Sequence, residues 1–299
     1  MRRARFMPAI GTPLTDEELL HEKGLEAELA MLANSGIRSI FVAGSMGAMP
    51  LLRYQTYQRL VEFSASLWRG DEIMVGAGDT SFGRTRERIE FLNRFPLNGV
   101  VVLAPYFWKF SQEDLIGYFI ELAAASRHPL FLYDLPQVTG TKLQLETVLA
   151  LSNTPNIAGI KCSDEPGYAR LVKDRAGERF RVIVAQPYLV DMCLRHGMNE
   201  HLDGIYTVAP EWTVAIGCAA EREDWSQAAE WQRKLSDLVL VFREFGMPAF
   251  TPLMNQRHVP GNFVPRPFRP LSDERQRELL ARPVVRELLE LPRANASSR

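Results

Sequence analysis

The sequence alternates between short apolar runs and longer amphipathic stretches along most of its length. Each run has about four to six strongly apolar residues rich in Val, Ile, Leu and Phe, which suits a strand buried on both faces better than a helix. The runs lie at residues 5–10, 37–44, 72–78, 99–105, 129–136, 157–163, 180–186 and 203–210. This pattern restricts the fold severely, because helices must cover the strands on both sides.

The stretches between the runs have the spacing of amphipathic helices. Leu25, Leu29 and Leu32 share one helical face, and Ser111 followed by Asp114 predicts a helix start with a side-chain cap. Eight strand–helix units of roughly 25–30 residues fit either a doubly wound open sheet or a closed barrel. Because the repeat is uniform and the count is eight, we predict an α/β fold of the (β/α)8 TIM barrel type.

The chain becomes mostly helical beyond residue 210. Helices are predicted at 211–221, 223–245 and 272–290, with a proline-rich stretch at 259–271 before the last of them. These exceed what the eighth unit of a barrel needs. We therefore expect a barrel over residues 1–222 and a C-terminal helical extension over 223–299 that packs on it.

Composition excludes several classes of function. The 299 residues carry a formal net charge of −1 and no apolar stretch long enough to cross a membrane, so neither nucleic acid nor membrane is an expected partner. Three widely spaced cysteines indicate a reducing compartment, and we expect a cytoplasmic protein. Metal-ligand spacing is absent, and His196 and His201 are expected at the surface.

Lys161 is the most informative single residue. It is one of only six lysines, and it ends the apolar run Ile157–Ile160 at the place where a barrel presents its active site. A desolvated lysine has a lowered pKa and can attack a ketone as a neutral amine. The same position also suits a lysine that only extends to solvent or pairs with Asp164, and position alone does not decide between these readings.

Two further strand ends carry candidate groups. Tyr133 ends the fifth run, where a phenol can move protons during imine chemistry. The loop from Gly44 to Gly47 follows the second run, and its backbone N–H groups with the Ser45 hydroxyl could hold a carboxylate. Alone, each has an ordinary structural alternative, a rim tyrosine or a tight turn.

Taken in order, these positions resemble the N-acetylneuraminate lyase / dihydrodipicolinate synthase superfamily. The shared pattern is a G-[ST]-x-G loop, a Y-x-x-P segment and a G-[IV]-K segment. Here they read Gly44-Ser-Met-Gly47, Tyr133-Asp-Leu-Pro136 and Gly159-Ile-Lys161. The segments GTPLT, PYFWKFSQEDL and the C-terminal helices extend the resemblance over almost the whole chain.

The resemblance implies a homotetramer of barrels without metal or organic cofactor. Pyruvate or a 2-keto acid would form a Schiff base with Lys161, with Tyr133 and Ser45 moving protons. The carboxylate would lie on the loop of Gly44, Ser45, Met46 and Gly47. The sequence also departs from the family pattern. Val138 replaces the arginine that holds a second carboxylate in the synthases, Ala48 replaces a glutamate, and Phe107 replaces a tyrosine supplied by a neighbouring subunit.

These departures favour, by elimination, an aldolase that cleaves or forms a 2-keto-3-deoxy sugar acid. Polar groups expected near the mouth of the barrel would contact its hydroxyls: Asp134, Gln137, Thr139, Gln186 and Thr207. Two alternatives stay open. One is another reaction of the same imine, either a synthase-like condensation or the dehydration or decarboxylation of a keto-deoxy acid. The other is a catalytically impaired barrel that binds a 2-keto acid as a sensor, which the loss of a phenol at Phe107 would allow.

Overall fold

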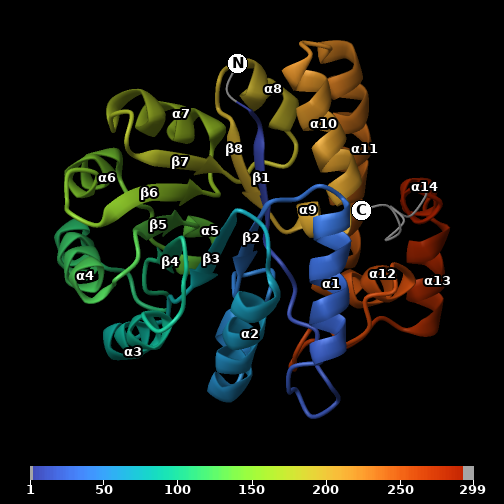
Figure 1. Ribbon diagram of the computed structural model, residues 1–299, viewed down its shortest axis with the longest axis horizontal. Helices are drawn as coiled ribbons and strands as arrows, with labels where there is room; N and C mark the ends of the chain where they lie inside the picture. The colour runs from blue at the N-terminus through green and yellow to red at the C-terminus, as the bar shows by residue number, and fades with distance from the viewer. Residues whose placement is uncertain (1–2, 292–299) are drawn as a thin grey trace.

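The structure is a computed structural model that describes residues 3–291. Eight parallel strands form one sheet in the order β1-β8-β7-β6-β5-β4-β3-β2 (Figure 1). A bridge between Ala9 and Phe41 joins the two ends, so that the sheet closes into a barrel. The strands are β1 (Arg5–Pro8), β2 (Ser39–Val42), β3 (Glu72–Gly76), β4 (Gly99–Leu103), β5 (Leu130–Asp134), β6 (Ile157–Cys162), β7 (Arg181–Val184) and β8 (Glu200–Asp203). The predicted (β/α)8 barrel is confirmed.

Helices alternate with the strands and cover the barrel. Those of the barrel region are α1 (Glu22–Asn34), α2 (Tyr54–Leu67), α3 (Phe82–Leu92), α4 (Gln112–Ala125), α5 (Pro136–Thr139), α6 (Leu145–Leu151), α7 (Pro166–Arg175), α8 (Val190–Arg195), α9 (Ile205–Val208) and α10 (Pro210–Glu221). A short 3-10 helix, η1 (Met49–Leu51), follows β2. The predicted cap of α4 is present, because Ser111 and Asp114 bond to each other's backbone N–H groups.

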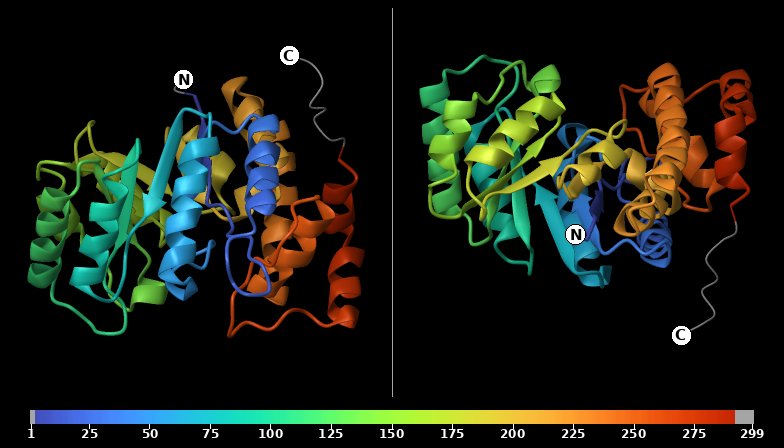
Figure 2. Two further views of the ribbon diagram at one scale, coloured as in Figure 1. Left: turned by 60° about the horizontal axis from the view of Figure 1, so that its bottom comes forward. Right: turned by 90° about the horizontal axis from the view of Figure 1, so that it is seen from above.

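The remaining helices gather on one side of the barrel, where Figures 1 and 2 show them in orange and red. They are α11 (Trp225–Phe245), α12 (Phe250–Gln256), α13 (Asp273–Ala281) and α14 (Pro283–Leu289), with η2 (Met247–Ala249) before α12. The prediction of one helix over 272–290 is wrong, because Pro283 cannot continue a helix and starts a new one. Helix α12 was not predicted. The division at residue 222 stays a prediction.

The eighth strand lies earlier than predicted. The run at 203–210 is mostly helical, and β8 ends at Asp203. The Asp203 carboxylate accepts a hydrogen bond from the Ile205 amide at 3.0 Å, which turns the chain into α9. His201 is therefore part of a strand and is buried against the Phe6 ring, with ring centroids 5.6 Å apart. The expectation of a surface His201 is wrong, and burial lowers its pKa to about 4.

Side chains of the strands alternate between the barrel interior and the helices. The interior holds a compact apolar cluster of Met7, Ala9, Phe41, Met74, Val101, Leu103, Phe131, Tyr133, Ile183 and Leu202. At the amino-terminal ends of the strands, Arg181 bonds to both Glu72 and Glu200 at 2.6 Å, and Arg5 bonds to Glu72 at 2.8 Å. The charges of these arginines and glutamates neutralise one another, so we assign this end a structural role. We expect the active site at the carboxyl-terminal ends of the strands.

Helix α1 carries a buried carboxyl group. Glu28 of α1 is fully buried, and its Oε1 accepts a hydrogen bond from the Gly11 amide at 2.8 Å. Burial raises the pKa of Glu28 from 4.5 to about 8. The folded chain therefore keeps a proton on this carboxyl that the unfolded chain loses at lower pH.

We expect the stability of the protein to depend on pH through Glu28. Its contribution is complete below about pH 4.5 and is lost as the pH rises to about 8, because the unfolded chain ionises first. Glu28→Gln keeps the acceptor for Gly11 and cannot ionise. At pH 9 this variant should be more stable than the wild type by on the order of 4 kcal/mol. Urea unfolding at pH 6 and pH 9 measures this, and an equal pH dependence in both proteins would contradict it.

Candidate active site

Lys161 lies at the carboxyl-terminal end of β6 and points into the barrel. It is paired in register with Tyr133 of β5, and only 5% of its surface is exposed. Gly159, two residues earlier on the same face, leaves room for the Phe131 ring, whose atoms would lie 2.8 Å from an added Cβ. The apolar layer beneath Lys161 thus holds its ammonium at the mouth of the barrel.

The Lys161 ammonium has two close neighbours. Its Nζ donates a hydrogen bond to Ser163 Oγ at 3.0 Å and lies 3.7 Å from the centre of the Tyr133 ring. Asp164, the alternative partner weighed from the sequence, pairs instead with Lys142. Lys161 is therefore held by a neutral hydroxyl and an aromatic face.

Tyr133 connects the lysine to the loop after β2. Its hydroxyl lies 3.2 Å from Ser45 Oγ. A hydrogen bond from the Thr12 hydroxyl to the Gly47 carbonyl, at 2.7 Å, holds this loop in place. Within residues 3–291, the amides of Ser45 and Met46 have no protein acceptor. The structure thus brings Lys161, Tyr133 and the Ser45 loop together at one end of the barrel.

A charged network supports the neighbouring loop. Lys142 Nζ pairs with Asp134, whose side chain is fully buried, and lies 2.8 Å from Asp164 Oδ2. The Leu143 amide also donates to Asp134 at 3.1 Å. Burial raises the pKa of Asp134 even though these donors lower it. The network ties the segment after β5 to the end of β6.

Removing the cation of this network should destabilise the fold. Lys142→Met leaves Asp134 buried without its ammonium partner, and we expect a loss of about 2 kcal/mol, below the range for fully buried pairs because Lys142 is partly exposed. Urea unfolding of Lys142→Met measures this loss. Adding Asp134→Asn should restore part of the stability, and a double variant less stable than the sum of both single changes would contradict the assignment.

The other polar residues predicted near the mouth use their hydrogen-bonding groups within the protein. Gln137 donates to the Asp164 carboxylate at 3.0 Å, and Gln186 donates to the Asp164 carbonyl. The hydroxyl of Thr139 donates to the Thr141 carbonyl at 3.0 Å, and that of Thr207 donates to the Ala9 carbonyl at 2.9 Å. Gln186 and Thr207 stay predictions as substrate contacts.

Two of the residues that depart from the family pattern are exposed at this end, one in a loop and one in a short helix. Phe107, in the loop after β4, is 83% exposed and adopts a positive φ of 86°, with its ring edge-to-face against Trp108. Val138, in α5, is 61% exposed. Ala48 ends the Ser45 loop in the left-handed region and is the N-cap of η1.

Sequence reasoning missed two groups at the site, Ser163 and Asp203. Ser163 follows Lys161 by two residues and holds its ammonium. Asp203 at the end of β8 lies within electrostatic reach of Lys161; burial raises the Asp203 pKa, and Lys161 opposes that rise. Tyr106, which directly follows the fourth apolar run as strand-end position predicts, lines the same cavity as Ser45 and Tyr133. A position at the end of a strand was the sequence signal that could have indicated these groups. Asp203 did not show it, because the eighth strand was predicted at 203–210, beyond its observed position.

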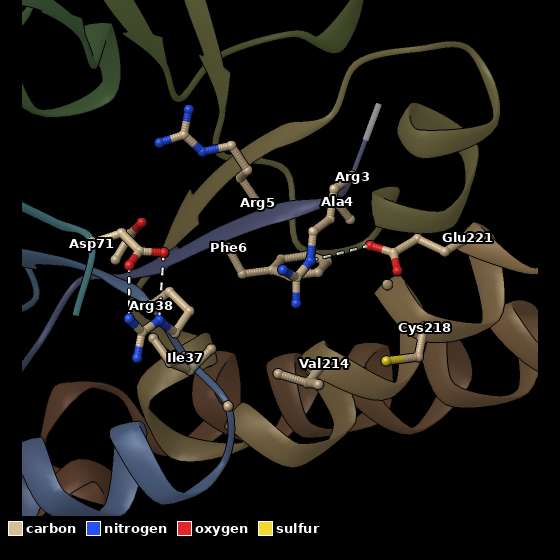
Figure 3. Close-up of a pocket in the computed structure, with 13 residues that line it drawn as sticks. Arg3, Ala4, Arg5, Phe6, Ile37, Arg38, Asp71, Val214, Cys218 and Glu221 are labelled. Atoms are coloured by element: carbon tan, nitrogen blue, oxygen red, sulfur yellow. Dashed lines mark hydrogen bonds and ion pairs between the residues drawn. The ribbon is translucent and has the colours of Figure 1, made fainter. Parts of the chain in front are cut away.

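A second cavity, of about 290 Å³, lies at the amino-terminal end of the barrel (Figure 3). Its arginines are matched by carboxylates: Arg38 bonds to Asp71 at 2.7 Å, and Arg3 lies 3.7 Å from Glu221. We therefore place the functional site at the opposite end. Among residues 3–291 no group of His, Cys, Asp and Glu has the arrangement of a metal site. No helix in this part of the chain is long and apolar enough to cross a membrane.

Comparison with known proteins identifies the family of the chain. A model of the dihydrodipicolinate synthetase family matches residues 2–282. The chain belongs to this family. Its members are class I lyases and aldolases that use a lysine Schiff base, and the protein is an enzyme of this type.

Individual relatives carry different activities in their names. A 4-hydroxy-tetrahydrodipicolinate synthase of Natronomonas pharaonis is 25% identical, over 91% of this chain and 94% of its own. A probable 2-dehydro-3-deoxy-D-pentonate aldolase, YjhH of Escherichia coli K12, is 27% identical, over 79% of this chain and 81% of its own. The chain's membership of the family is thus established, whereas the relatives named here differ in substrate.

Solved structures show the same fold. YagE of E. coli K12, in complex with pyruvate, superposes with a TM-score of 0.88 at 24% identity, covering 96% of this chain and 99% of its own. A variant of the Sulfolobus solfataricus 2-keto-3-deoxygluconate aldolase gives a TM-score of 0.84 at 23% identity, covering 93% and 94%.

Proposed function

We propose that the protein is a pyruvate-dependent class I aldolase that cleaves or forms a 2-keto-3-deoxy acid, a class that includes the sugar acids named for two of its relatives. The observation that supports this most is the linked set at the barrel mouth. Lys161 Nζ lies 3.7 Å from the Tyr133 ring, and the Tyr133 hydroxyl lies 3.2 Å from Ser45 Oγ. Amine, phenol and hydroxyl are the groups that imine formation and carbon–carbon cleavage need.

Each residue has a defined role in this proposal. The Lys161 amine attacks the ketone and forms the imine, whose positive nitrogen withdraws electrons from the carbon chain. Tyr133 exchanges a proton with the reacting oxygen, and Ser45 continues the relay. The amides of Ser45 and Met46 bind the 2-keto acid carboxylate, while Gly44 and Gly47 shape the loop. We also assign a substrate-binding role to Val138, Gln186 and Thr207.

Two alternatives keep the same binding chemistry. The first is a different fate of the imine, such as the condensation named for the synthase relatives or a dehydration. The second is a sensor that binds a 2-keto acid without turnover, which the exposed Phe107 in place of a phenol favours. We also propose a homotetramer in the cytoplasm, needing no metal or organic cofactor.

A panel of 2-keto-3-deoxy acids distinguishes these readings. Incubation with each acid should release pyruvate, detected by a coupled lactate dehydrogenase assay, if the protein is an aldolase. Consumption of the acid without pyruvate release would indicate dehydration or decarboxylation. Borohydride trapping of a pyruvate adduct without turnover of any acid would favour the sensor. Absence of both trapping and turnover would reject the proposal.

A further inference from the structure

A cavity of about 140 Å³ opens beside the hydroxyls of Ser45 and Tyr133, on the side of strands β2 to β5. Its walls are almost entirely carbon, and no charged side chain is among the lining residues. The side chains that make the apolar wall are Phe41, Met49, Pro50, Val101, Leu103 and Leu135. Of the lining side chains, only Ser45, Tyr106 and Tyr133 carry a polar group.

The rim of this cavity is also apolar. Val138 closes one side and is 61% exposed, so it presents isopropyl carbon at the rim. The polar residues nearby do not compensate, because Gln137, Thr139 and Gln186 are bonded to the protein. A chain of hydroxyl groups entering here would therefore lose hydrogen bonds to water and find few partners.

We propose that the carbon chain beyond the new carbon–carbon bond is apolar, so that the aldehyde partner of pyruvate carries a phenyl or branched alkyl group. This rests on the proposed function and narrows it. In the forming direction, carbon 3 of the enamine on Lys161 bonds to the aldehyde carbon. The aldehyde oxygen takes the Tyr133 proton and becomes a hydroxyl, and water then releases the 4-hydroxy-2-oxo acid from Lys161.

The size of the cavity agrees with this class. An apolar cavity of about 150 Å³ in a protein stays dry and accepts benzene, so about 140 Å³ suits a phenyl or branched alkyl group. A hydrophobic pocket rejects a substrate in which a hydroxyl replaces a methyl by about 10²-fold. A sugar-like aldehyde with two such hydroxyls should therefore be a much poorer substrate.

The test compares two aldehydes of equal shape in the wild-type protein. Glyceraldehyde and 2-methylbutanal differ only in having two hydroxyls in place of two methyls. With saturating pyruvate, kcat/KM should be higher for 2-methylbutanal by at least about 10²-fold, the factor for a single hydroxyl. Val138→Asn at the rim and Leu103→Asn in the wall should each lower this ratio by about tenfold or more. Leu171→Asn, on the exposed surface of α7, is the matched control and should leave the ratio unchanged.

The outcomes separate the two proposals. If borohydride traps pyruvate but glyceraldehyde is preferred, or neither aldehyde condenses, the apolar subsite is wrong while the imine remains. A ratio that the Val138 and Leu103 variants leave unchanged also overturns the subsite. If no pyruvate adduct forms at all, the proposed function fails, and the subsite fails with it.

Discussion

Lys161→Ala should abolish both pyruvate trapping by borohydride and turnover of every substrate. The alanine variant lacks the amine that forms the imine, and no neighbouring lysine replaces it, because Lys142 is held by two carboxylates. The change removes a side chain at the barrel mouth rather than in the packed interior, so the fold should persist. Circular dichroism checks the fold, and mass spectrometry after reduction checks the adduct.

Two companion variants make this prediction specific. Lys161→Arg keeps the positive charge but cannot condense with a ketone, so it should be as inactive as alanine. Lys173→Ala, an exposed lysine of α7, should behave as the wild type. Activity in Lys161→Arg would show that only a charge is needed at this position and would remove imine chemistry from the account.

Tyr133→Phe should lower kcat by about 10²–10⁴-fold. The ring that packs below Lys161 Nζ remains, whereas the hydroxyl 3.2 Å from Ser45 Oγ is lost. We therefore expect pyruvate to be trapped slowly but still completely. Rapid quenching with borohydride measures the rate of adduct formation, and steady-state assays measure kcat.

Tyr106→Phe is the matched comparison for Tyr133→Phe. Tyr106 lines the same cavity but makes no hydrogen bond to Ser45, so its loss should slow turnover by less than about tenfold. A larger effect in Tyr106→Phe than in Tyr133→Phe would transfer the proton relay to Tyr106. That residue would then replace the phenol that the family pattern places at Phe107.

Much of the barrel could be predicted because its strands are buried on both faces and stand out as apolar runs. The eighth strand could not, since its residues Glu200–Asp203 include three polar side chains and the apolar run after it folds into α9. His201 is buried by stacking on Phe6, a contact between two strands far apart in the sequence that no local pattern records. Hydrophobic periodicity indicates a buried residue only where its neighbours in the sequence are also apolar and buried.

The juxtaposition of Lys161, Tyr133 and the Ser45 loop could also be predicted, because strand ends converge in a barrel. The partners of those residues could not. Lys142 pairs with Asp134 and Asp164 across two loops, and Lys161 is held by Ser163. The expectation that polar residues such as Gln186 would meet substrate hydroxyls depended on their being unpaired, and pairing is a property of the folded chain.

The proposed chemistry depends most directly on one covalent bond, between Lys161 and pyruvate. Reduction with borohydride in the presence of pyruvate, followed by peptide mapping with tandem mass spectrometry, locates any adduct in the chain. We expect one reduced pyruvyl group, on Lys161, and none on the other five lysines. An adduct on a different lysine, or no adduct under conditions that trap a known class I aldolase, would contradict it.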